Sequence, residues 1–133
     1  MRYLALDWGK KRIGTAKGDD ETGIAFPDGI LRNTRNFFNE LRALCQKEKI
    51  GALVIGIPKT LRGEYGPQAK EIFEFIAGLK KSFSLPIFLE DERFTTKIAA
   101  RIFGPVRRTH MDAISAALIL QSFFDKKKKR SQN

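Results

Sequence analysis

Short apolar runs separated by turns dominate the first quarter of the chain. Residues 3–6 form one such run, which ends at Asp7, and its β-forming residues predict a buried strand. Residues 12–17 and 24–31 predict two further strands, each joined to the preceding one by a short turn and antiparallel to it. Pro27 favours an edge position for the third strand, because proline cannot donate a ladder hydrogen bond.

Helical and strand patterns alternate along the rest of the chain. Helices are predicted by apolar spacing and capping residues near 35–50, 69–79, 95–102 and 112–124. A strand covered on both faces is predicted by the continuous apolar run at 52–57, and a further strand is predicted at 86–89. The order βββ, αβ, αβ, αα predicts one α/β domain over residues 1–125, with a mixed five-stranded sheet of three antiparallel and then two parallel strands.

Charge adds a candidate partner to this picture. The 133-residue chain carries a net charge of +10, and residues 126–130 supply five of these charges, which leaves 10 − 5 = 5 on the body. Phosphate backbones are the expected partner of such a balance. Residues 126–133 are expected to be a disordered basic tail, and a purely solubilising role for that tail stays open.

Hydropathy and cysteine content favour a cytoplasmic protein. No apolar stretch approaches the roughly 20 residues that a membrane span needs, and Asp7 interrupts the N-terminal apolar run, so no signal peptide is expected. The single cysteine, Cys45, excludes an intramolecular disulfide, which fits a reducing compartment.

Acidic residues end three separate apolar segments. They are Asp7, the cluster Glu90-Asp91-Glu92, and Asp112. A carboxylate on a buried strand is unfavourable unless a positive charge meets it, and carboxylate oxygens are the ligands that hard divalent cations prefer. The pattern therefore suggests a divalent-metal centre. Two alternatives stay open: Asp7 could cap a turn or pair with Arg12, and Asp112 could be an acid in the first turn of a helix.

Four motifs, in order, resemble the YqgF/RuvX family over residues 2 to about 125. They are Leu6-Asp7-Trp8-Gly9-x-Lys11-Arg12-Ile13-Gly14, Gly56-Ile57-Pro58 with Gly63, Asp91-Glu92-Arg93-Phe94-Thr95-Thr96, and Asp112 with Ala113, Ala116 and Ala117. The resemblance implies a ribonuclease H-like fold with sheet order 3-2-1-4-5 and helices on both faces. Members of this family are described as Holliday-junction-resolvase-like proteins and as nucleases that process the 5′ end of pre-16S ribosomal RNA. The segment at 104–110 is shorter here than in many relatives, which would alter substrate recognition if that segment grips nucleic acid.

The resemblance places the chemistry on the acidic and basic residues. Two Mg²⁺ or Mn²⁺ ions about 4 Å apart can activate water and stabilise the charge of a cleaved phosphodiester. The expected catalytic and metal-binding residues are Asp7, Asp91, Glu92 and Asp112. The residues expected to steer the phosphate backbone are Lys11, Arg12, Arg93, Arg107 and Arg108.

The implied sheet order leaves one geometric problem. The strand at 53–57 would lie beside the first strand, yet it carries no acid. The acids lie one strand further, roughly 10 Å from Asp7. Asp91 and Glu92 would point to opposite faces, so only one of them is expected to be a ligand, and the sequence does not separate them. Glu90 is expected to be an ordinary exposed residue.

The sequence thus predicts a cytoplasmic, metal-dependent endonuclease that processes the 5′ end of pre-16S ribosomal RNA, with nucleic acid and pre-ribosomal particles as partners. Two alternatives remain: a Holliday junction resolvase that acts on branched DNA, and a non-catalytic nucleic-acid-binding or ribosome assembly module. Both a monomer and a homodimer are compatible with the chain.

Overall fold

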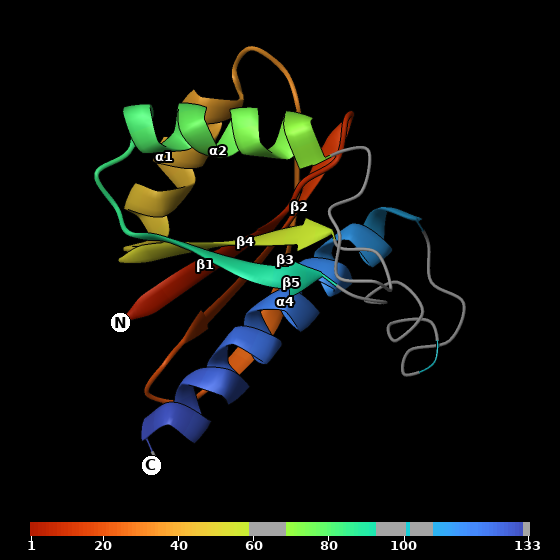
Figure 1. The fold of residues 1–133 in the computed structure, drawn as a ribbon. Helices are drawn as coiled ribbons and strands as arrows, with labels where there is room; N and C mark the ends of the chain where they lie inside the picture. The colour runs from red at the N-terminus through yellow and green to blue at the C-terminus, as the bar shows by residue number, and fades with distance from the viewer. Residues whose placement is uncertain (59–68, 93–100, 102–107, 132–133) are drawn as a thin grey trace.

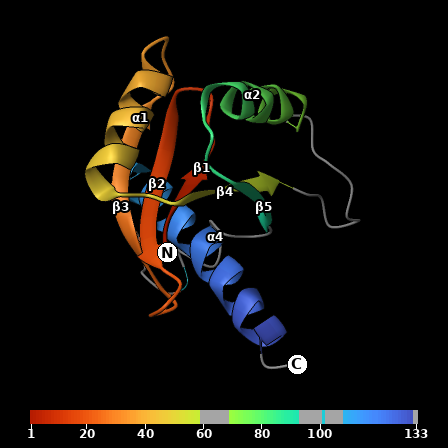
Figure 2. The same ribbon diagram turned by 90° about the vertical axis from the view of Figure 1, so that its left-hand side faces the viewer.

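Five strands form one mixed sheet, and helices cover both of its faces (Figure 1 and Figure 2). The computed structural model describes residues 1–58, 69–92, 101 and 108–131, and within these ranges it leaves out the side chains of residues 58, 92, 108–110 and 131. The strands are β1 (Arg2–Asp7), β2 (Arg12–Asp19), β3 (Ile24–Arg32), β4 (Ala52–Pro58) and β5 (Ile87–Glu92). The helices are α1 (Phe37–Glu48), α2 (Ala69–Ser82) and α4 (Arg108–Ser131).

The strand order is β3-β2-β1-β4-β5, which confirms the order implied by the resemblance. The first three strands pair antiparallel, and β1, β4 and β5 run parallel. Strand β3 lies at the edge, as Pro27 predicted. Pro27 pairs with Ala16 and Gly29 with Thr15, so Asp28 is the extra residue of a β-bulge.

Alternation along the strands divides the core into two layers. Leu4 and Leu6 of β1 pack with α1 and α2 on one face, whereas Tyr3 and Ala5 pack with α4 on the other. Strand β4 is buried on both faces, as its continuous apolar run predicted. Figure 2 shows α1 and α2 on one side of the sheet and α4 on the other.

Small residues on β2 let α4 approach the sheet closely. Gly14, Ala16 and Gly18 share the face that carries α4. A Cβ atom added to Gly18 would lie 2.8 Å from Cε2 of Phe124 on α4, and one added to Gly14 would lie 2.0 Å from the backbone oxygen of Asp112. Only glycine fits where backbone and helix come this close.

Helix α4 differs from its prediction at both ends. It begins at Arg108 and continues through Ser131, so residues 126–131 belong to a helix and the prediction of a disordered tail is wrong there. Two effects hold this polar end: cations complement the helix C-terminus, and Lys126 pairs with Glu90 of β5. The predicted helix at 95–102 lies outside the described residues except at position 101, which is helical. Every helix in the described ranges is too short or too polar to span a membrane.

Candidate active site

Asp7 of β1 and Asp112 of α4 both lie next to Gly14 of β2. Asp7 ends β1 and pairs with Gly14 of β2 in the antiparallel ladder. The backbone of Asp112 lies against the same Gly14, because a Cβ on Gly14 would be 2.0 Å from its oxygen and 2.4 Å from its carbonyl carbon. Two acids that are distant in sequence are therefore brought next to one another.

The same face of the sheet carries both acids. Asp7 follows Tyr3 and Ala5 at alternate positions, and these two residues pack against α4. Asp7 is half-buried at this strand end, and Asp112 is half-buried on the helix. The described residues thus contain two of the three predicted acidic positions in one place.

Asp112 lies in the second turn of α4, so the prediction that it is an acid in the first turn is wrong. Its Oδ2 atom is buried and lies 3.1 Å from Nε of Arg12, in an orientation that makes an ion pair without a directed hydrogen bond. A buried carboxylate oxygen without a hydrogen bond is unfavourable unless a cation stands nearby. Arg12 supplies one such positive charge through its ion pair with Asp112.

The two acids at the end of β5 separate by strand alternation. Asp91 is four residues after Ile87, so the two side chains lie on the same face of β5. Ile87 packs against the core under α1 and α2. Asp91 is therefore exposed on the face opposite Asp7 and Asp112. Glu92 pairs with Pro58 at the end of the ladder, and its side chain lies outside the described residues.

Glu90 is buried, so its prediction as an exposed residue is wrong. Only 6% of Glu90 is accessible. Ser122 of α4 donates a hydrogen bond of 3.0 Å to its Oε1, and Lys126 pairs with the same oxygen. The pairing register aligns one residue from each of three neighbouring strands, namely Leu6 of β1, Ile55 of β4 and Leu89 of β5. Glu90 follows Leu89 as Asp7 follows Leu6, so the two acids lie at the same level of the sheet. Two partners from α4 already satisfy its charge.

The predicted phosphate-binding residues are only partly described. Lys11 is exposed, and Arg12 is 35% exposed while it pairs with Asp112. Arg93 and Arg107 lie outside the described residues, as does the side chain of Arg108, whose backbone begins α4.

Within the described part of the chain, no three Asp, Glu, His or Cys side chains lie close enough together to hold a metal ion. Asp7 and Asp112 are hard oxygen donors, and the buried Oδ2 of Asp112 accepts no hydrogen bond from the described part of the chain. These properties fit a divalent cation with oxygen ligands.

The fold defines the class of protein first. The structure resembles T. thermophilus RuvC in complex with a Holliday junction substrate, with a TM-score of 0.58, 10% identity and coverage of 96% of each chain. It also resembles the fowlpox virus resolvase in complex with Holliday junction DNA, with a TM-score of 0.55, 12% identity, and coverage of 96% of this chain and 99% of that one. The chain therefore has the ribonuclease H-like fold of these resolvases.

Sequence comparison defines the family. Residues 1–126 match the RuvX family, described as Holliday junction resolvase. A protein named "Putative pre-16S rRNA nuclease" from Thermoanaerobacter pseudethanolicus is 33% identical, with 98% of this chain and 100% of that protein aligned. Proteins of the same name from Anaplasma marginale and Fusobacterium nucleatum are 39% and 38% identical, over 97% and 96% of this chain and 87% and 99% of their own lengths. The chain belongs to the RuvX (YqgF) family.

Gly14 and Glu90 are the two residues whose importance sequence reasoning missed. Gly14 stood in a quoted motif, but nothing local showed that a helix backbone would press against it. The alternation of Gly14, Ala16 and Gly18 was the available signal for a closely packed partner. Glu90 carried no such signal, because only its burial under α4 distinguishes it from the acids that follow it.

Proposed function

We propose that this protein is a metal-dependent nuclease that hydrolyses phosphodiester bonds in structured RNA, with the 5′ end of pre-16S ribosomal RNA as its substrate. The observation that carries the proposal is the meeting of Asp7 and Asp112 at Gly14, on one face of a ribonuclease H-like sheet. A cytoplasmic location is part of the same proposal.

Asp7, Asp112 and Glu92 would hold the divalent ion, Mg²⁺ or Mn²⁺. Asp7 and Asp112 share a face, and the buried Oδ2 of Asp112 has no hydrogen-bond partner among the described residues. When bound, such an ion supplies water activation and compensation of negative charge at the scissile phosphate. Arg12 holds the carboxylate of Asp112 in place through its ion pair, and its partly exposed guanidinium can also attract the phosphate backbone.

Glu92 is proposed as the third ligand in preference to Asp91. Asp91 points to the face that carries α1 and α2, away from the other two acids. Position 92 is two residues after Glu90, and positions two apart on a strand share a face. Glu90 faces α4. Glu90 itself is not chosen, because Ser122 and Lys126 already engage its carboxylate.

The relatives' names support the choice of substrate, and the positive charge of this chain suits a phosphate polymer. The direct test is cleavage of a pre-16S RNA fragment in Mg²⁺ or Mn²⁺ by the wild type, Asp7→Asn and Asp125→Asn. Asp125 is an exposed acid on α4 and controls for the loss of one negative charge. Asp7→Asn should lose cleavage at least 100-fold and Asp125→Asn should retain it. Equal activity of the wild type and Asp7→Asn would refute the proposed site.

The family description makes a four-way DNA junction the matched competing substrate. Paired cuts in a synthetic junction, without cleavage of the RNA fragment, would assign the site to DNA. A non-catalytic assembly role would be indicated if calorimetry found RNA binding but no binding of Mn²⁺ to the wild type.

A further inference from the structure

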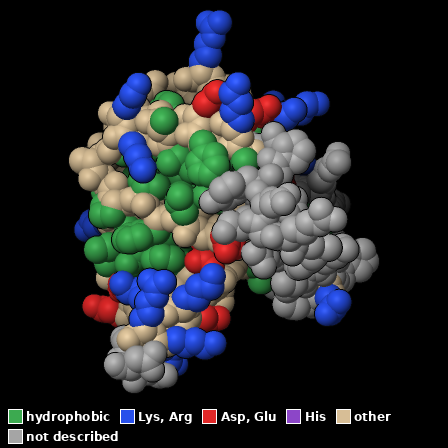
Figure 3. Space-filling model, in the orientation of Figure 1, with side chains coloured by type: hydrophobic (Ala, Val, Ile, Leu, Met, Phe, Trp, Pro, Cys, Tyr) green, Lys and Arg blue, Asp and Glu red, His purple; other side chains and the backbone are tan. Residues whose placement is uncertain are grey.

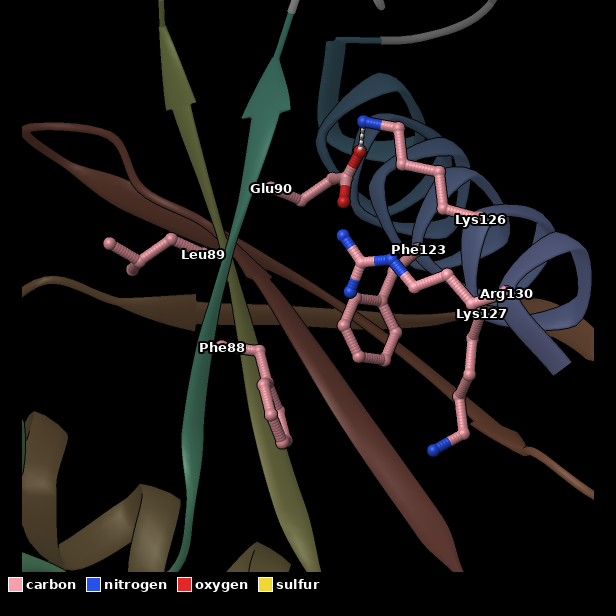
Figure 4. Close-up of a pocket in the computed structure, with 7 residues that line it drawn as sticks. All are labelled: Phe88, Leu89, Glu90, Phe123, Lys126, Lys127 and Arg130. Atoms are coloured by element: carbon pink, nitrogen blue, oxygen red, sulfur yellow. Dashed lines mark hydrogen bonds and ion pairs between the residues drawn. The ribbon is translucent and has the colours of Figure 1, made fainter. Parts of the chain in front are cut away.

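A pocket between β5 and the C-terminal part of α4 combines exposed aromatic rings with cations. Its volume is about 230 Å³, and its lining residues are Phe88, Leu89, Glu90, Phe123, Lys126, Lys127 and Arg130. Phe88, Phe123 and Arg130 point into the space between strand and helix, whereas Leu89 points away from it (Figure 4). We infer that this pocket binds a single-stranded segment of RNA that flanks the scissile phosphate, an inference that rests on the proposed nuclease function.

The aromatic wall of the pocket is packed against neighbouring rings and accessible from outside. Phe88 is 39% exposed on the edge strand β5. Its ring centroid lies 5.3 Å from that of Phe123 and 6.3 Å from that of Tyr3, which is fully buried. A ring supported from behind and open in front is a surface on which a nucleobase can stack, independently of sequence.

The cations of the pocket come from successive turns of α4. Lys126 is engaged by Glu90, and Lys127 contacts the Tyr3 hydroxyl at 3.3 Å and Asp20 at 3.7 Å. Arg130 has neither a hydrogen bond nor an ion pair among the described residues, and its guanidinium points toward the pocket in Figure 4. Figure 3 shows Lys and Arg side chains gathered over the C-terminal half of α4, beside hydrophobic side chains. Cations at a helix C-terminus also complement the macrodipole, but that effect does not require an exposed aromatic ring beside them.

Size and position favour a polymer over a small molecule. The pocket is smaller than the roughly 300–1,000 Å³ of cavities that bury small ligands, so it fits one base or one sugar-phosphate unit of a longer chain. It lies on the same face of the sheet as Asp7 and Asp112. Phe88 stands four positions before Glu92 on β5, a separation of about 13 Å, which a few nucleotides of single strand can cover.

The test measures binding in EDTA, where no cleavage occurs, by fluorescence anisotropy with the full-length chain. The probes are an RNA hairpin alone and the same hairpin with a single-stranded flank on either side. Phe88→Leu removes the stacking face and keeps an apolar side chain, and Arg130→Gln removes the guanidinium charge. The matched controls are Phe73→Leu, at a phenylalanine on α2 that is 38% exposed, and Lys129→Gln, at an exposed lysine next to Arg130 on α4.

The flank should strengthen binding by the wild type and by both controls. Phe88→Leu should weaken binding of the flanked RNA about five-fold or more, the lower end of one base–aromatic stack. Arg130→Gln should lower the slope of log K against log salt by about 0.7. If the pocket variants and their controls bind the flanked RNA equally, the inference is overturned. The inference is also overturned if Phe88→Leu and Arg130→Gln weaken binding of a poly-glutamate peptide more than binding of the RNA, since the pocket would then suit an acidic protein segment.

The outcomes separate this inference from the proposed function. Flank binding that depends on Phe88 and Arg130, in a protein that cleaves nothing in Mn²⁺, would support the pocket and refute the nuclease. Cleavage with no effect of the pocket variants on flanked substrates would support the nuclease and refute the pocket.

Discussion

Replacement of Gly14 by alanine tests how closely Asp112 of α4 must approach β2. The added Cβ would lie 2.0 Å from the backbone oxygen of Asp112, whereas ordinary contacts begin at 3.4 Å, so strand and helix must separate by about 3.4 − 2.0 = 1.4 Å. Both neighbours are backbone, and no flexible side chain can turn aside. Overpacking of this kind typically costs about 1–3 kcal/mol of unfolding free energy.

The effect on cleavage should exceed the effect on stability. A misplacement of about 1 Å in a catalytic arrangement can reduce the rate about 100-fold. We therefore expect Gly14→Ala to lose at least that much Mn²⁺-dependent cleavage, measured on a pre-16S RNA fragment at a temperature where urea titration shows the variant to be folded.

Two further glycines provide matched controls. An alanine at Gly18 would meet the Ile24 oxygen at 2.5 Å and Phe124 at 2.8 Å, so it should destabilise the fold without moving Asp112. An alanine at Gly29 would meet only the Thr15 hydroxyl, at 3.9 Å, and should change stability and cleavage little. A folded Gly14→Ala protein with the activity of Gly29→Ala would refute the reasoning that this contact positions the site.

Three other predictions follow from particular side chains. Glu92→Gln should abolish cleavage whereas Asp91→Asn should retain most of it, and equal losses in a metal-titrated assay would contradict the face assignment of the two acids. The hydrogen bond from Lys17, at 3.3 Å, lowers the pKa of Glu48 below its usual 4.5. This carboxylate therefore stabilises the fold above pH 4.5, and the contribution is lost as the pH falls through the lowered pKa. Urea titrations at acidic pH should show that the free energy of unfolding falls less steeply with pH for Glu48→Gln than for the wild type. An equal fall in both proteins would contradict this role of Glu48. Burial raises the pKa of the Cys45 thiol to about 11, so near pH 8 only roughly one thiol in a thousand is ionised. Labelling with iodoacetamide, followed by mass spectrometry, should require unfolding, and prompt labelling of the folded protein would contradict this burial.

The fold was predictable because its signals are local. Continuous apolar runs predicted β4 and the first half of β5, and Pro27 predicted the edge position of β3. The strand order came from the resemblance of four motifs to a known family, since local patterns do not say which strands become neighbours. The end of α4 was missed because residues 126–131 have no apolar periodicity, and Lys126 is anchored by an acid from another element.

The site was predictable in its residue types but not in its arrangement. Acids at the ends of apolar segments pointed to Asp7 and Asp112, since a carboxylate there needs a positive partner. Their meeting at one glycine could not be predicted, because it depends on the packing of α4 against Gly14 of β2. The role of Glu90 was missed for a similar reason: its two partners, Ser122 and Lys126, lie on the last helix.

By itself, the sequence determined which residues are chemically able to bind metal and phosphate, and the order of strands and helices that carries them. The tertiary structure decided which acids share a face: Asp7 and Asp112 lie together on the side of α4, and Asp91 lies on the other side. The physical reason is that side-chain direction follows the pairing register and the packing of distant elements, whereas residue type and apolar periodicity are properties of the local chain. The third acid of the proposed site depends on that same register at the end of β5.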